Sequence, residues 1–291
     1  MAGNSQIQII TDGTAILPIE RLRELNITVL PIVARIGNKS FMYDQQTPGH
    51  IDLLSESRKT RGLIEIVGPS PDDFRAAFVR SLYRTNRMLV ILSSGRLSPV
   101  VQNARTAARD FMGRCDITIL DSQSVSVGLG ILLERAGELL QRGDVPLPDV
   151  VRLIRGMIPR TYVVMISHTL DYIYRSGKIT STQAILGAML KIHPFIAMEE
   201  GDVIPMEKSR RPERALDKLV EFASEFSRIQ RLVIFHGRRA PDNEVLILKE
   251  RLEQIAPSVE IPLIAYDPIV ASHVGPEGLG LVIYEGAWRQ A

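Results

Sequence analysis

Residues 88–108 read MLVILSSGRLSPVVQNARTAA, and this stretch decides the fold. Leu89 to Leu92 form a continuous apolar run of strand length, which predicts a buried strand. Serines follow at positions 93 and 94, and Ser98 stands where a helix N-cap belongs, with Pro99 in the first helical position. A strand that delivers hydroxyls and free helix N–H groups to one sheet edge is a candidate site for an oxygen-rich anion. The plainer alternative is that these serines only cap and turn the chain.

Around this stretch, predicted strands and helices alternate up to residue 159, which is typical of a parallel, doubly wound α/β sheet. Extended segments are expected over 6–11, 27–36, 64–67 and 117–120, and Gly37–Asn38 predicts a hairpin turn. Ser70 is expected to cap a helix, with Asp73 at the capping-box position. Gly128 and Gly130 indicate tight packing of a helix, because a third glycine of a dinucleotide-binding loop is missing.

Beyond residue 159 the pattern becomes mixed. An antiparallel hairpin is expected from residues 193–198 and 203–208, which flank Glu200–Gly201–Asp202. We therefore expect two α/β domains, residues 1–159 and 160–291, the first with a mainly parallel doubly wound sheet and the second with a mixed sheet. Helices over 126–158 are candidates for a bridge between them.

Composition sets the broad class of protein. The chain has 291 residues, 45% of them hydrophobic and 23% charged, and its formal net charge is only +2, so it is expected to be globular. No basic run is interleaved with aromatic residues, which argues against a nucleic-acid partner. The single cysteine, Cys115, forms no internal disulfide. No run reaches the roughly 18 apolar residues of a membrane span, and the first residues lack a signal-peptide pattern. We expect a cytoplasmic protein.

Two aspartates raise the possibility of an enzyme. Asp12 and Asp121 each follow a predicted strand, and a metal-dependent hydrolase or phosphotransferase would use both carboxylates at adjacent strand ends. Their simpler role is in turns and caps. The five histidines show no ligand spacing, so neither a metal nor a cofactor is expected. His273 precedes a segment rich in glycine and proline, which is either a plain turn or a place where an imidazole donates to a carboxylate or phosphate.

Several short motifs, taken in order along nearly the whole chain, resemble the DegV family. They are Ile10–Thr11–Asp12, Gly68–Pro69–Ser70–Pro71, Ser93–Ser94 with Leu97–Ser98, Leu120–Asp121–Ser122, the segment 186–194 and His273–Val274–Gly275–Pro276. The resemblance implies two α/β domains with a long-chain fatty acid at their junction. It also implies a protein that is not an enzyme, uses no cofactor, and presents the fatty acid carboxylate to a separate fatty acid kinase, which makes the acyl-phosphate.

Carried over to this sequence, the resemblance implies a ligand site of these residues: Ser93, Ser94, Ser98, His273, Gly275, Ile66 and Arg210. The apolar face of residues 186–192 is implied along the tail. Arg210 is implied either at the head group or on the surface where the kinase docks. Ile66–Val67 stands where the family has Thr-Ser, so one hydroxyl expected at the carboxylate is missing. A further alternative is therefore a family member that binds no ligand and acts only as an interaction partner.

Overall fold

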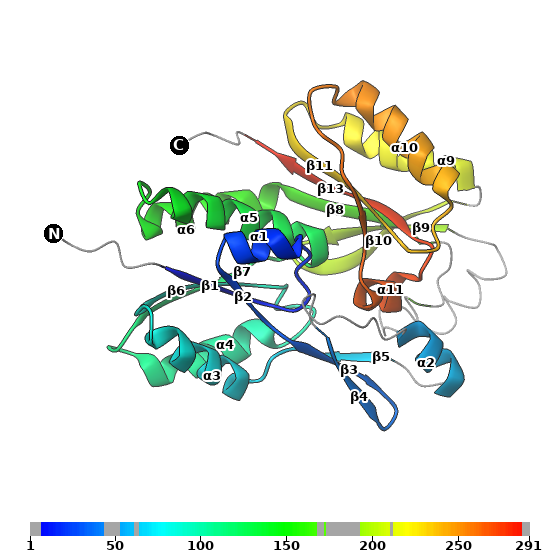
Figure 1. Ribbon diagram of the computed structural model, residues 1–291. Coiled ribbons are helices and arrows are strands. Elements are labelled where there is room, and N and C mark those ends of the chain that lie inside the picture. Colours follow the sequence, from blue (N-terminus) through cyan, green and yellow to red (C-terminus); the bar gives the residue numbers. More distant parts are fainter. Residues whose placement is uncertain are drawn as a thin grey trace.

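A computed structural model describes residues 7–43, 53–60, 64–167, 172, 193–209 and 212–286 of the chain. In this part of the chain, helices and sheets stack in alternating layers (Figure 1). A parallel sheet lies between two helical layers, and one of those layers also covers a second, mixed sheet, whose outer face carries further helices. The α/β class and the two kinds of sheet predicted from the sequence are thereby confirmed.

The first sheet is parallel and has the strand order β2-β1-β6-β7. Its strands are β1 (Gln8–Asp12), β2 (Ile27–Leu30), β6 (Arg87–Leu92) and β7 (Asp116–Asp121). One face packs on α3 (Pro71–Leu82) and α4 (Val100–Ala108), and the other packs on α1 (Ile19–Glu24) and α5 (Ser126–Arg142). Residues Met88 to Leu92 are buried, as expected for a strand covered on both faces.

The start of α3 shows why the local prediction worked. The Ser70 hydroxyl accepts from the N–H of Asp73 at 3.3 Å, and the Asp73 carboxylate accepts from the N–H of Ser70 at 2.8 Å. This reciprocal capping box satisfies two N–H groups that the helix itself leaves unpaired. Phe74, Ala77 and Phe78 then lie on the buried face. After α4 the chain makes a short 3₁₀ turn, η1 (Arg109–Phe111).

A small antiparallel sheet, in the order β4-β3-β5, projects from the first layer. It consists of β3 (Ile32–Ile36), β4 (Lys39–Tyr43) and β5 (Ile64–Val67), with α2 (Leu53–Thr60) against β3. The hairpin at Gly37–Asn38 is confirmed. The extended segment expected over 27–36 is present as two strands, because Pro31, which has no N–H, separates β2 from β3 and the two strands join different sheets.

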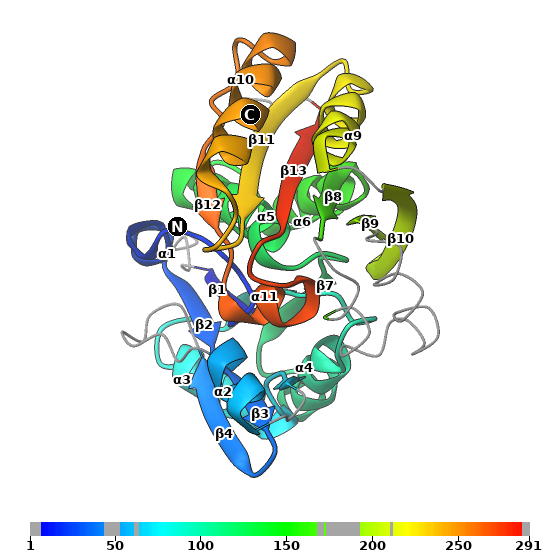
Figure 2. The same ribbon diagram turned by 90° about the vertical axis from the view of Figure 1, so that its right-hand side faces the viewer.

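The second sheet is mixed and has the order β10-β9-β8-β13-β11-β12. Its strands are β8 (Thr161–Ile166), β9 (His193–Glu199), β10 (Asp202–Ser209), β11 (Ile229–His236), β12 (Leu263–Ala265) and β13 (Leu279–Glu285). The β9–β10 hairpin confirms the antiparallel pair predicted there. The outer face carries α9 (Pro212–Ser224) and α10 (Asp242–Ile255). Figure 2 shows α11 (Pro268–Val274) between this sheet and α2.

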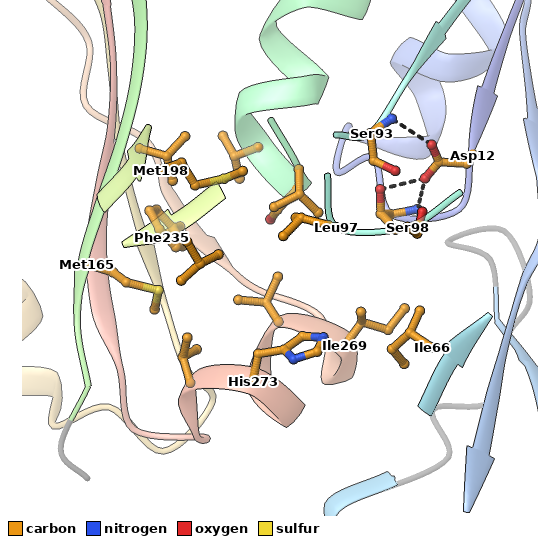
Figure 3. Close-up of a pocket in the computed structure, with 18 of the residues that line it drawn as sticks. Asp12, Ile66, Ser93, Leu97, Ser98, Met165, Met198, Phe235, Ile269 and His273 are labelled. Atoms are coloured by element: carbon orange, nitrogen blue, oxygen red, sulfur yellow. Dashed lines mark hydrogen bonds between the residues drawn. The ribbon is translucent and has the colours of Figure 1, made fainter. Parts of the chain in front are cut away.

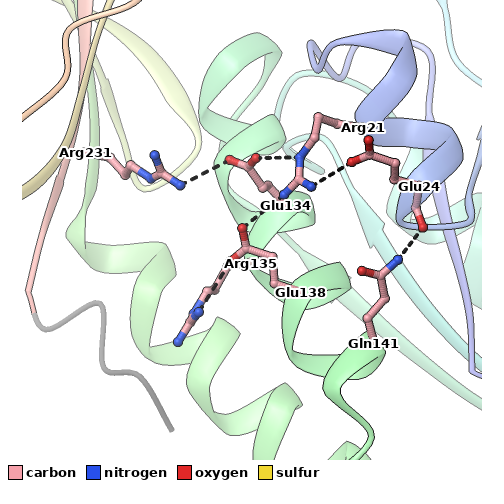
Figure 4. A network of polar contacts seen from close by, with 7 residues as sticks. All are labelled: Arg21, Glu24, Glu134, Arg135, Glu138, Gln141 and Arg231. Atoms are coloured by element: carbon pink, nitrogen blue, oxygen red, sulfur yellow. Dashed lines mark hydrogen bonds and ion pairs between the residues drawn. The ribbon is translucent and has the colours of Figure 1, made fainter.

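The middle layer of α5 and α6 (Leu147–Met157) packs on both sheets. One continuous apolar cluster joins Leu89 and Ile91 of the first sheet, Leu132 of α5, and Val233 and Val282 of the second. At the edge of this layer, Arg21 of α1 pairs with Glu134 and Glu138 of α5, both at 3.1 Å, and Glu134 also meets Arg231 of β11 at 3.6 Å (Figure 4). The domain boundary at residue 159 falls in the 3₁₀ turn η2 (Ile158–Arg160) and stays a prediction.

Two glycines let α5 approach its neighbours. A Cβ at Gly130 would clash with the carbonyl oxygen of Ile16, and a Cβ at Gly128 would clash with the hydroxyl of Ser124. The predicted role of these glycines in tight helix packing is confirmed. Their absent side chains fix how closely the start of α5 sits against the loop after β1.

We expect Gly130→Ala to lower the free energy of unfolding by about 1–3 kcal/mol, because the added methyl overlaps the backbone of Ile16. Urea unfolding monitored by circular dichroism measures this. Gly156→Ala is the matched control, since Gly156 is exposed within α6 and a Cβ there meets no described atom within 4 Å. That change should raise stability by about 0.5–1 kcal/mol. Equal stability of the two variants would contradict the packing role.

Candidate functional site

The carboxyl ends of β1 and β6 form the polar end of the site. Asp12 ends β1 and is fully buried, and its carboxylate accepts three hydrogen bonds. The donors are the N–H of Thr14 at 3.0 Å, the hydroxyl of Thr14 at 2.6 Å and the N–H of Ser93 at 2.7 Å. The strand order reverses at β1, and open α/β sheets bind ligands at such a point, outside the carboxyl ends of the strands.

Two of the predicted serines present hydroxyls here. Neither the Ser93 nor the Ser98 hydroxyl has a hydrogen-bond partner among the residues that the structure describes, and both residues line a cavity. The predicted N-cap role of Ser98 is wrong. The N–H groups of Leu97 and Ser98 both turn back onto the carbonyl of Ser94, so α4 starts at Val100 with Pro99 as its N-cap and without a side-chain cap. The Ser98 hydroxyl is therefore available to the cavity.

The cavity has a volume of about 290 Å³, at the lower end of the range usual for small-molecule sites. Figure 3 shows Asp12, Ser93 and Ser98 at one end and Met165, Met198 and Phe235 at the other. Its remaining lining is mostly apolar: Ile32, Ile66, Leu97, Val100, Val125, Val127, Val163, Ile196, Ala197, Val203, Ile269, Val270, Val274 and Val282. The cavity therefore combines one polar end with an apolar wall to which the mixed sheet, the small antiparallel sheet, α5 and α11 contribute.

His273 enters the cavity from α11, the helix that the sequence analysis missed by treating this region as a turn. The imidazole lies along one side, near Ile269 and Ile66 (Figure 3). Asp267 starts α11 as its N-cap and accepts from the N–H groups of Ile269 and Val270 at 2.9 and 2.8 Å. The sequence signal was present, because an aspartate followed by a proline is a favoured helix start. The short length of α11 concealed it.

Gly275 is the C-cap of α11 and positions the end of this helix. Its φ of +92° lies in a region that side chains rarely adopt, and a Cβ there would lie 2.8 Å from the ring of Tyr172. Its carbonyl accepts from the hydroxyl of Tyr266 at 2.6 Å. Gly275 is not among the residues that line the cavity. The glycine therefore positions the end of the helix that carries His273.

Ser94 lies next to the cavity and not in its lining. Its buried hydroxyl donates to the carbonyl of Gly201, at the tip of the β9–β10 hairpin, at 2.7 Å. Arg96 adds an ion pair to Asp202 of the same hairpin at 3.2 Å. These contacts join the loop after β6 to the second sheet. Two other predicted elements of the site, Arg210 and residues 186–192, lie outside the described residues.

The structure separates the two aspartates of the enzyme alternative. They were expected at adjacent strand ends, and this was wrong, because β6 lies between β1 and β7. Strands two apart are separated by about 10 Å. Asp121 accepts from the N–H groups of Gln123 at 2.9 Å and Gly95 at 3.2 Å, which is a turn role. Among the described residues, no group of three or more His, Cys, Asp or Glu side chains is placed to hold a metal ion.

A profile of the family described as "Uncharacterised protein, DegV family" matches residues 6–286. The chain belongs to the DegV family. A DegV domain-containing protein of Deinococcus radiodurans is 30% identical over 231 residues, which cover 79% of each chain. The DegV family protein of Thermus thermophilus, whose structure concerns fatty acid binding, has a TM-score of 0.82 at 26% identity and covers 97% of this chain and 100% of its own.

A second solved DegV-like structure shows the same fold. The Fatty Acid Kinase (Fak) B3 protein of Streptococcus pneumoniae, loaded with linoleic acid, has a TM-score of 0.81 at 19% identity, covering 97% of this chain and 100% of its own. The DegV resemblance expected from the motifs is confirmed. The described part of this DegV chain contains no helix with the length and apolar character needed to cross a bilayer.

The structure adds residues to the site that the sequence analysis did not select. Thr14 and Ser126 line the cavity beside Ser93, and Met165, Met198 and Phe235 line its far end. The three apolar residues sit in ordinary strand patterns of the second sheet, so nothing local distinguishes them from core residues. Only the pairing of distant strands brings them to one cavity.

The cap of α11 gives a pH dependence. Burial raises the pKa of the Asp267 carboxyl to about 6, and one carboxylate oxygen, Oδ2, has no partner among the described residues. Between about pH 4 and 6, the Asp267 carboxyl therefore keeps its proton in the folded protein, whereas the same carboxyl in the unfolded chain has lost its proton. The stabilising contribution is present below pH 4 and is lost as the pH rises to 6, which lowers the free energy of unfolding by up to about 3 kcal/mol.

Asp267→Asn keeps an acceptor for the helix and removes this titration. In urea unfolding between pH 4 and 7, the wild type should lose stability relative to Asp267→Asn as the pH rises. Asp242→Asn, which removes an exposed acid from the first turn of α10, is the control for the loss of one carboxylate at a helix start. A difference between the wild type and Asp267→Asn that stays constant with pH would disprove the titration.

Proposed function

We propose that this DegV protein binds a long-chain fatty acid non-covalently in the cavity between its two sheets and presents the carboxylate to a separate fatty acid kinase. The observation that carries the proposal is the division of the cavity into one polar end at Asp12 and Ser93 and an apolar remainder that ends at Met165, Met198 and Phe235. A fatty acid likewise has one polar end, its carboxylate, and an apolar chain. The binding of fatty acids by the Thermus thermophilus relative supports this ligand.

The tail supplies most of the affinity in this proposal. Each buried CH₂ contributes about 0.8 kcal/mol, so a chain of sixteen carbons contributes roughly 10 kcal/mol before the cost of association. Two methionines at the far end suit such a chain, because their unbranched thioethers adapt to ligands of different shape. The tail therefore does not depend on a single contact.

The head group is proposed to accept hydrogen bonds from Ser93, Ser98 and His273. A carboxylate accepts up to about four such bonds, and each charge-assisted bond contributes about 1.5–3 kcal/mol. Ile66 offers only apolar contact beside His273, so the donors must come from the serine loop and α11. Ser94 and Gly275 act indirectly, through the hairpin and through α11. Arg210 keeps both proposed roles, at the head group or on a docking surface.

The proposal also includes a kinase partner and a cellular location. The fold shared with the Fak B3 protein supports a partner that phosphorylates the presented carboxylate. In this role the chain itself is not an enzyme and needs no cofactor. We propose the cytoplasm as its location, in keeping with a chain whose single cysteine forms no internal disulfide.

Native mass spectrometry of the purified protein tests the proposal first. We expect a stoichiometric adduct of a fatty acid, which denaturing extraction then identifies by chain length and unsaturation. Protein that is purified empty should take up oleate or palmitate added in solution. Protein that arrives empty and takes up neither acid would refute fatty acid binding and favour the alternative of an interaction partner without a ligand.

His273→Ala tests the head-group arrangement. Removing the imidazole should weaken binding of oleate about tenfold or more, since one charge-assisted hydrogen bond is lost. Displacement of a fluorescent fatty acid measures the affinity. His236→Ala is the control, because His236 ends β11, does not line the cavity, and has its ring within 3.0 Å of the carbonyl of Gly237. Unchanged affinity of His273→Ala would remove His273 from the site.

A further inference from the structure

Phe235 of β11 closes the end of the cavity that lies opposite Asp12. Figure 3 shows Phe235 between Met198 and Met165, and all three side chains line the cavity. Phe235 is 2% exposed and belongs to the apolar cluster between the two sheets, so its ring is part of the core and of the cavity wall at once. The residues packed around this ring decide whether the end of the cavity can give way to a ligand.

The pairing of β11 with β13 gives the ring a place over Gly280. Gly280 lies directly opposite Phe235 in the antiparallel register, and a Cβ there would lie 2.6 Å from Cζ of Phe235. The same Cβ would lie 2.7 Å from Cβ of Met165, the residue of β8 that is opposite Gly280. The ring therefore lies across the backbone of β13 toward β8, in space that a side chain at position 280 would fill.

Tyr266 packs against the same ring and is itself fixed in place. The two ring centroids are 6.1 Å apart with an interplanar angle of 62°, an edge-to-face contact. Tyr266 is 2% exposed, does not line the cavity, and donates its hydroxyl to the carbonyl of Gly275 at 2.6 Å. Phe235 is therefore the rigid part of this end of the cavity, whereas the unbranched side chains of Met165 and Met198 beside it adapt their shape.

We propose that Phe235 is the residue that determines the length of the acyl chain that this protein selects. The inference rests on the proposed function and deepens it. The terminal methyl of the preferred fatty acid meets the ring of Phe235, and a longer acid binds more weakly because its additional carbons find no space. Each CH₂ that does fit tightens binding about fourfold, so affinity rises with chain length until the methyl reaches Phe235 and then falls.

The test is a series of even-numbered saturated fatty acids, from decanoate to icosanoate, measured on delipidated protein by displacement of a fluorescent fatty acid. The affinity of the wild type should pass through a maximum within the series. Phe235→Ala removes the ring, so its maximum should move to an acid about two or more carbons longer, which it binds about tenfold or more tightly than the wild type does. Phe235→Leu removes less of the core and should move the maximum in the same direction by a smaller step, and it decides the test if thermal melting shows that Phe235→Ala does not fold.

Phe222→Ala is the matched control. Phe222 of α9 packs against Tyr162 and Phe195 on the outer face of the second sheet and does not line the cavity, so its loss should leave the maximum at the wild-type chain length. Met165→Leu, which nearly conserves volume, should also leave the maximum in place. Folded Phe235 variants that keep the wild-type maximum overturn the role of Phe235 alone, and so does a wild type whose affinity still rises at icosanoate. A wild type that binds no acid of the series overturns the proposed function, and the inference with it.

Discussion

The carboxylate of Asp12 is the group on which the polar end of the cavity depends. A buried carboxylate is costly unless its oxygens are hydrogen-bonded, and here Thr14 and Ser93 supply three donors from two different strand ends. These bonds fix the loop after β1 against the loop after β6. Because Asp12 already accepts bonds from its own chain, its function is to position Thr14 and Ser93. In the sequence, a carboxylate at a strand end suggested a metal ligand. In the structure, this carboxylate accepts hydrogen bonds from Thr14 and Ser93 instead.

The position of α5 follows from this constraint. The loop after β1, which Asp12 organises, receives the start of α5 through backbone hydrogen bonds of Ser126 with Thr14 and Ile16. Gly130 allows this approach, because a side chain there would overlap Ile16. On the side of the second sheet, α5 lies close to β8, because a Cβ at Gly128 would lie 3.0 Å from the side chain of Val163. One helix thus sets the separation of the two sheets, and the cavity occupies the space at its start.

The sequence predicted features that depend on neighbouring residues and missed those that depend on distant ones. The capping box of Ser70, the buried strand before Ser93 and the hairpin at Gly37 are local, and each is present. The pairing of β5 with β3 is not local, and nothing within residues 64–67 distinguishes it from a strand of the parallel sheet. The backbone contacts of Ser126 with Thr14 and Ile16 could not be predicted either, because they result from how α5 packs against the loop after β1.

The two ends of the cavity obey different physical rules. Apolar burial is not directional, so in the proposed function the wall of valines, isoleucines and methionines accepts acyl chains of different shape, and its contribution grows with the length of the acyl chain. Hydrogen bonds to a carboxylate are directional, and their donors must be held in place before the ligand arrives. Ser93 is held by Asp12, and His273 is carried by a helix that Asp267 caps and Gly275 ends. In the proposed function, Ile66 contributes no donor, so recognition of the head group depends on the alignment of Ser93 with His273, and a ligand that contacts both connects the first sheet to α11.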